Sequence, residues 1–131
     1  MIENELKRIQ NVVSALDTDI SNEKAFDYLV CSAYCLKSLE YQKNHYDLKT
    51  QYICDGKSDG GIDFIYYDDD NAKIIIGQNK YSENIKVNDA VSEIEKVINT
   101  LEDFSKNNTN SYNREVKRML RNALDRLPEE N

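Results

Sequence analysis

Apolar residues recur along the chain at two different spacings, and each spacing predicts a different kind of element. Apolar side chains every three or four residues, the spacing of an amphipathic helix, mark residues 3–16, 23–40, 88–104 and 112–126. Two short apolar runs, residues 62–67 and 73–77, flank a cluster of acidic and amide turn formers, which is typical of a β-hairpin. Residues 50–54 have the composition of one more strand. The predicted order is helix, helix, three strands, helix, helix.

This order predicts an α/β domain in which helices flank a small mixed sheet of about three strands, with the hairpin at its centre. A chain of 131 residues is long enough for one domain with a hydrophobic core. A sheet this small has an edge that no later strand in the sequence covers. We expect the edge to be covered by further domains of a longer chain, of which residues 1–131 form the N-terminal part, or by a partner such as a second copy.

The turn of the hairpin fixes its register. If Asp70 and Asn71 lie at the centre, the numbers of facing residues sum to 141, as those of Asp70 and Asn71 do. The facing pairs are then Ile65 with Ile76, Tyr67 with Ile74, and Asp68 with Lys73, the last being a pair of opposite charges.

The same register brings three polar residues together at the open end of the hairpin. Asp63 falls opposite Gln78, and Lys80 lies on the same face because side chains alternate along a strand. Carboxylate and amide oxygens are hard ligands for Mg²⁺ or Mn²⁺, and the backbone carbonyl of Asn79 can complete the shell. An ammonium group beside such an ion stabilises the negative charge that develops when a phosphodiester is hydrolysed. The sequence therefore predicts a metal and catalytic site here.

These residues also match a known motif. Gly60–Asp63, separated by fourteen residues from Gln78–Tyr81, resembles the PD-(D/E)xK nuclease superfamily in its Mrr-like Gln-x-Lys variant. The segment looks most similar to the N-terminal domain of abortive-infection phage-resistance (AIPR) proteins, and Ala25–Val30 resembles the Phe-Glu helix of those nucleases. The resemblance covers residues 20–105. It implies a restriction-endonuclease-like core, a Mg²⁺- or Mn²⁺-dependent nuclease acting on DNA, with RNA as the alternative, and a place in prokaryotic anti-phage defence.

The resemblance also implies a role for each residue. Asp63 corresponds to the metal-binding aspartate, Gln78 takes the glutamate position of the motif, and Lys80 corresponds to the catalytic lysine. Such a site takes a further acid from a neighbouring helix. We favour Asp27 for that position, and Glu23, one turn earlier on the same face, is the alternative.

The charge balance argues against DNA binding by overall attraction. The chain has 24 acidic and 17 basic residues, a net charge of −7, whereas a protein that holds DNA by charge alone is usually basic. The charge is uneven, since residues 113–126 carry five basic and two acidic residues. A solvated helix face is the simplest interpretation of that run. The acidic charge and the unusual helix acid favour the alternative to an active enzyme, a catalytically inactive nuclease-fold module that binds nucleic acid or protein.

Two of the three cysteines, Cys31 and Cys35, are predicted to pack in the core. Cys31 and Cys35 lie one turn apart on an apolar helix, and together with His45 and Cys54 they lack the spacing of a zinc site, so we reject one. No apolar run approaches the roughly 20 residues of a membrane span. The first residues also lack the basic and apolar regions of a signal peptide. We therefore expect a cytoplasmic protein with no membrane partner.

Overall fold

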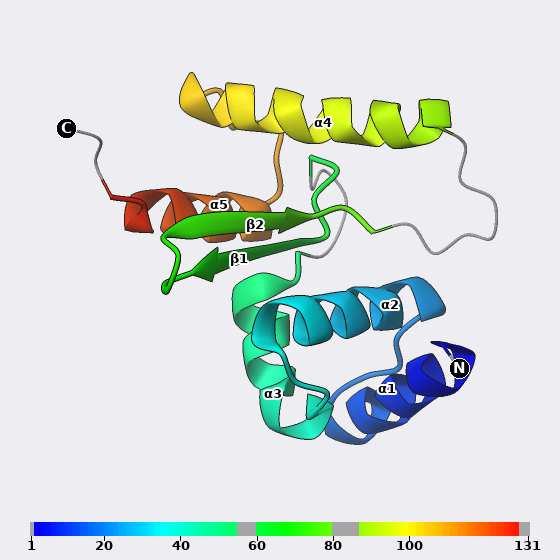
Figure 1. The fold of residues 1–131 in the computed structure, drawn as a ribbon. Coiled ribbons are helices and arrows are strands. Elements are labelled where there is room, and N and C mark those ends of the chain that lie inside the picture. Colours follow the sequence, from blue (N-terminus) through cyan, green and yellow to red (C-terminus); the bar gives the residue numbers. More distant parts are fainter. Residues whose placement is uncertain (1, 55–59, 80–86, 129–131) are drawn as a thin grey trace.

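The computed structural model describes residues 2–54, 60–79 and 87–128, which form a mixed α/β fold as predicted (Figure 1). Its helices and strands are α1 (Ile2–Leu16), α2 (Asn22–Val30), α3 (Tyr41–Asp47), β1 (Phe64–Asp68), β2 (Lys73–Gly77), α4 (Val87–Ser105) and α5 (Arg114–Arg126). Two π-helical segments, η1 (Cys31–Leu36) and η2 (Leu48–Tyr52), directly follow α2 and α3.

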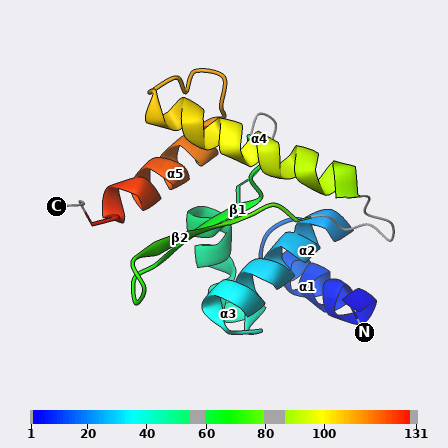
Figure 2. The same cartoon turned by 45° about the horizontal axis from the view of Figure 1, so that its top comes forward.

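The hairpin of β1 and β2 lies between two helical layers. Helices α1, α2 and α3 cover one face, and α4 and α5 lie on the other, in both views of the ribbon (Figures 1 and 2). Alternate residues of β1 therefore enter different cores: Phe64 packs with the first layer and Ile65 with the second. Because both faces are covered, the two strands are apolar on both sides.

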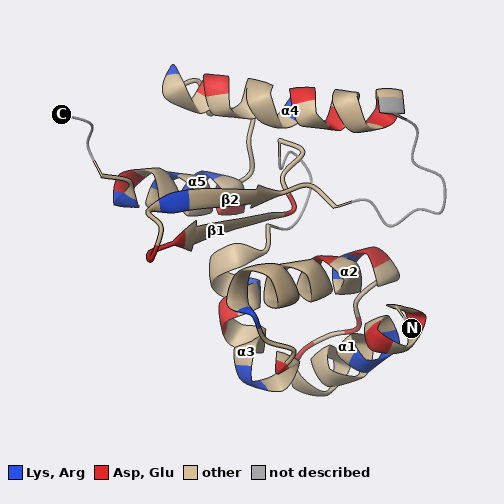
Figure 3. Ribbon diagram, viewed as in Figure 1, with Lys and Arg blue, Asp and Glu red and all other residues tan. Residues whose placement is uncertain are grey.

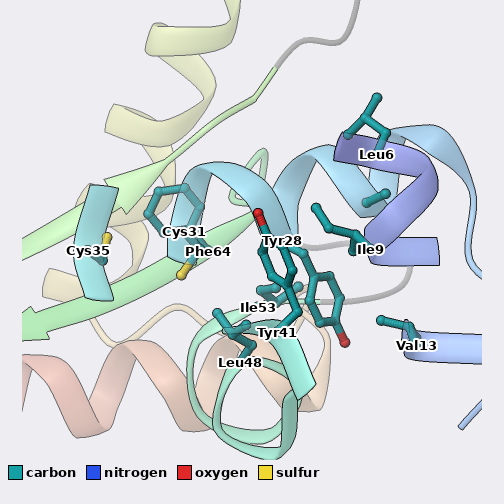
Figure 4. Packing of buried hydrophobic residues seen from close by; sticks show 11 residues of the cluster. Leu6, Ile9, Val13, Tyr28, Cys31, Cys35, Tyr41, Leu48, Ile53 and Phe64 are labelled. Carbon is teal, nitrogen blue, oxygen red and sulfur yellow. The ribbon is translucent and has the colours of Figure 1, made fainter. Parts of the chain in front are cut away.

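The first core joins α1, α2, α3 and the two π-helical segments to one face of the hairpin (Figure 4). Helix α1 supplies Leu6, Ile9 and Val13, which follow helical spacing and are at most 1% exposed. Burying one such aliphatic side chain contributes about 1.5–3 kcal/mol to folding. Cys31 and Cys35 are buried in this core, as predicted.

The second core lies between the hairpin and helices α4 and α5. One stripe of α5 is buried there, formed by Val116, Met119, Leu120 and Ala123. Asn113 caps this helix, since its side-chain oxygen accepts a hydrogen bond of 2.9 Å from the Val116 N–H. The hairpin is thus held from both sides, which fixes the position of its open end.

The predicted register is confirmed along the hairpin. All five backbone pairs from Phe64–Gly77 to Asp68–Lys73 have residue numbers that sum to 141. The Asp68 carboxylate closes the turn, because it accepts hydrogen bonds from the backbone N–H groups of Asp70 and Asn71 at 3.1 and 3.3 Å. It also accepts one from the Asn71 side chain at 2.8 Å.

The structure differs from the predicted elements in three ways. Residues 50–54 do not form the third strand, because η2 runs to Tyr52 and only Ile53 makes an isolated antiparallel bridge, with Phe64. The sheet of the described residues therefore has two strands. The second helix ends at Leu36 and not at residue 40, since Lys37 takes a left-handed conformation with φ of 55°. Helix α3 was not predicted, although Tyr41, His45 and Leu48 recur at helical spacing and are all buried.

Candidate functional site

Asp63 lies at the open end of the hairpin, one residue before β1. Its backbone N–H donates to the Gly77 carbonyl at 2.8 Å, so here the ladder departs from the strict register that would set Asp63 opposite Gln78. Its own carbonyl accepts from the Cys54 N–H at 2.9 Å, and its Oδ2 accepts from the Asn79 backbone N–H at 2.7 Å. Backbone contacts therefore hold Asp63 on both sides, and its carboxylate faces the residue after Gln78.

Asn79 joins this carboxylate to a second one on helix α2. The Asn79 side-chain amide donates to Asp27 Oδ1 at 3.0 Å, while the Asn79 backbone donates to Asp63. Asp27 is buried, with 7% of its surface exposed. The two carboxylates are far apart in the sequence, and one asparagine bridges them.

Lys24 adds a positive charge beside the buried carboxylate. It lies one turn before Asp27 on α2, and its Nζ is 4.0 Å from Asp27 Oδ2. The same Nζ donates to the Cys54 carbonyl at 3.1 Å, so the lysine also ties α2 to the segment that leads into the hairpin. The Lys24 ammonium and the Asn79 amide therefore both lie at the buried Asp27 carboxylate.

Gln78 lines a hollow between the hairpin end and α4. The hollow has a volume of about 420 Å³ and is also lined by Asp63. Gln78 Oε1 is buried and accepts no hydrogen bond from the residues that the structure describes. A buried amide oxygen without a donor is costly in a folded protein. The Gln78 oxygen is therefore available as an acceptor or as a ligand.

The glycines before β1 let the backbone approach α4 closely at this hollow. Gly60 has φ of 70°, and its carbonyl accepts from the buried Thr100 hydroxyl at 2.7 Å. A Cβ at Gly60 would stand 2.5 Å from that hydroxyl oxygen, so both the conformation and the space require glycine. The pair Glu93 and Lys96 of α4, whose charged groups are 3.6 Å apart, borders the same hollow.

The structure brings together most of the residues that the sequence singled out. Asp63, Asn79 and Asp27 form one hydrogen-bonded chain, and Gln78 shares the hollow with Asp63. The alternative helix acid, Glu23, is exposed in the first turn of α2. Lys80 lies outside the described residues.

The donor chemistry of these residues suits a hard divalent cation. No group of three or more His, Cys, Asp or Glu side chains that could hold a metal occurs within residues 2–54, 60–79 and 87–128. Mg²⁺ needs fewer, because it commonly binds one or two carboxylates and keeps several waters. The candidate ligands are all oxygen atoms: the carboxylates of Asp63 and Asp27, and the Gln78 amide oxygen, which accepts no hydrogen bond from a described residue. Oxygen ligands fit Mg²⁺ or Mn²⁺ better than zinc.

Lys24, Lys96 and Thr100 were not identified from the sequence. Lys24 carried a weak signal, since a lysine three residues before an acid on a helix faces it. Lys96 and Thr100 carried none, because their place in the hollow depends on how α4 packs against Gly60 and Gly61.

No family model matches the chain, and searches of curated proteins and of solved structures find no match either. In the part of the chain that the structure describes, no helix is long and apolar enough to cross a membrane.

Proposed function

We propose that this chain is a metal-dependent nuclease domain with a restriction-endonuclease-like core that hydrolyses phosphodiester bonds in DNA. One observation carries the proposal: the Asn79 bridge sets the buried Asp27 beside Asp63, at the strand end from which Lys80 follows. Asp63 also shares a hollow with Gln78, whose buried amide oxygen accepts no hydrogen bond from a described residue, and such a pair of oxygen ligands suits a divalent cation.

Asp63 and Gln78 would hold Mg²⁺ or Mn²⁺, together with the Asn79 carbonyl and Asp27. When bound, such an ion supplies a Lewis acid for the phosphate group. Asn79 keeps the two carboxylates oriented through its backbone and side-chain N–H groups. Lys24 offsets part of the negative charge that Asp27 brings into a buried place.

Lys80 would complete the site. It directly follows Asn79 in the sequence, and Asn79 is the residue whose backbone N–H donates to Asp63. Its ammonium group would orient a water molecule and stabilise the charge that develops on the phosphate oxygens. The resemblance to abortive-infection proteins supports DNA as substrate and anti-phage defence as the setting, with RNA as the alternative substrate.

The proposal is tested by incubating the purified chain with plasmid DNA in Mg²⁺ or Mn²⁺. Wild type is expected to nick or linearise the plasmid, and Asp63→Asn and Lys80→Ala are expected to lose cleavage while keeping the circular dichroism spectrum and melting temperature of wild type. Asp70→Asn and Lys106→Ala are matched controls at exposed positions and should cleave like wild type.

The variants also separate an intrinsic activity from a contaminating nuclease. Cleavage that persists in Lys80→Ala and Asp63→Asn would show that the activity does not come from this site. Complete absence of cleavage by wild type on single- and double-stranded DNA and RNA would favour the inactive binding module instead.

A further inference from the structure

Helix α5 carries a hollow lined by positive charges. Among the residues that the structure describes, its lining consists of Arg114, Lys117, Arg118 and Arg121 with Thr109 and Asn110, none of which is acidic. The hollow has a volume of about 630 Å³. For a chain with a net charge of −7, this is an unusual concentration of cations. In the ribbon coloured by residue type, blue segments of basic residues lie on α5, whereas α4 carries several red segments of acidic ones (Figure 3).

Neighbouring groups neutralise little of this charge. Arg118 pairs with Glu115 at 2.8 Å. Arg121 donates only to neutral partners that the structure describes, the oxygens of Asn107 and Thr109 at 3.2 and 3.0 Å. Arg114 and Lys117 form no ion pair with a described residue. Three of the four lining cations are therefore free to meet negative charge from outside the chain.

A second large hollow shows the contrast. It has a volume of about 690 Å³, and the charged residues of the described chain that line it are three cations and three acids: Lys24, Lys49, Arg118, Asp17, Asp19 and Glu115. Its charges compensate one another, and Lys49 is paired with Asp17. That hollow gives no reason to expect a polyanion.

We infer that this α5 hollow is a contact surface for the phosphate backbone of nucleic acid. Arg114 and Arg121 are seven residues apart in the sequence, or about 10 Å along a helix that rises about 1.5 Å per residue. Along the axis of a duplex one strand advances about 3.4 Å per nucleotide, so an α5 that lies parallel to this axis spans roughly three nucleotides and not one isolated anion. Arginine, lysine, threonine and asparagine side chains are the common donors to phosphate oxygens.

The surface is also placed to act with the candidate active site. Tyr112 lines the hollow that contains Asp63 and Gln78, and Arg114, two residues later, lines the basic one. The two hollows are therefore lined by neighbouring parts of the chain, and a backbone held along α5 would pass near the residues proposed to act on the phosphodiester. The inference rests on the proposed function, because it assigns to that function the surface that holds its substrate.

Binding of a short fluorescein-labelled DNA duplex, measured by anisotropy in EDTA at several salt concentrations, tests the inference without cleavage. Arg114→Gln/Lys117→Gln is expected to weaken binding about tenfold or more and to reduce the slope of log K against log salt by about 2. Lys7→Gln/Lys43→Gln changes the net charge equally at exposed positions on α1 and α3 and should bind like wild type. Melting temperatures close to that of wild type show that both variants fold.

The outcomes distinguish this inference from the nuclease proposal. Unchanged affinity and slope in Arg114→Gln/Lys117→Gln overturn the inference, and so does a wild-type chain that binds no duplex at low salt. Equal losses in both double variants would mean that net charge alone matters, which also overturns it. Cleavage in Mn²⁺ is scored separately: a chain that binds through α5 but does not cleave contradicts the nuclease proposal and leaves the surface in place.

Discussion

The bridge between the two carboxylates can be tested by removing one side chain. Asn79→Ala deletes the amide donor to Asp27 but keeps the backbone N–H that contacts Asp63. Because Asp27 is only 7% exposed, water replaces the lost donor poorly. A hydrogen bond to a charged group contributes about 1.5–3 kcal/mol, so Asn79→Ala should lower the free energy of unfolding by that amount.

Urea unfolding followed by circular dichroism measures the effect. With a slope of about 1–3 kcal/mol per molar urea, the midpoint should fall by about 1 M while the slope stays unchanged. Asn71→Ala is the matched control, because it removes an amide-to-carboxylate hydrogen bond of 2.8 Å to Asp68 at an exposed turn. That control should cost less than about 1 kcal/mol.

A double-mutant cycle with Asp27→Ala isolates the interaction itself. The coupling energy between Asn79 and Asp27 should reach about 1–3 kcal/mol, as for residues in one buried network. If Asn79→Ala costs no more than Asn71→Ala, or if the coupling is near zero, the bridge does not orient Asp27 and the geometry proposed for the site is refuted.

Three further predictions concern the frame that positions the site. Gly77→Ala would place a methyl group in the Phe64 ring, so it should destabilise the fold by about 1–3 kcal/mol, and a midpoint in urea equal to that of wild type would contradict this packing. Ala72 has φ of 51°, a left-handed conformation that strains a residue with a Cβ, so Ala72→Gly should raise the free energy of unfolding by about 0.5–1 kcal/mol. A loss of stability would show that Ala72 is not strained. A hydrogen bond from Lys49 holds the pKa of Asp17 below its usual range, so its ionised form stabilises the fold above about pH 4 and the gain is lost as the pH falls. Asp17→Asn should therefore lower the melting temperature at pH 7 but not in acid; a difference that is the same at both pH values would show another cause.

The hairpin was the most predictable part of the fold. Its turn formers and opposed apolar runs are local signals, and the Asp68 carboxylate that closes the turn lies inside the same short segment. Helix faces with regular apolar spacing, such as that of α5, were likewise predicted to within two residues.

The predictions that failed concern the ends of helices, and the contact that was hardest to predict joins distant parts of the chain. Residues 50–54 contain strand formers, yet η2 continues to Tyr52, and the Ile53 N–H donates to the carbonyl of the buried Leu48 at 2.8 Å. The helical segment ends before Lys37, where the sequence contains no glycine or proline that would predict the end of a helix. At the site, Asp63 and Asn79 could be placed together from the hairpin alone. The contact of Asp27 with Asn79 requires α2 to pack against the hairpin, and only the family resemblance suggested it.

The central claim is that Asp63 and Gln78 hold a divalent cation, and a crystal soaked in Mn²⁺ tests it most directly. Anomalous scattering should give one manganese peak about 2.0–2.3 Å from oxygens of both residues, and Asp63→Asn crystals treated in the same way should lose it. A wild-type crystal in millimolar Mn²⁺ with no peak between Asp63 and Gln78 would contradict the account.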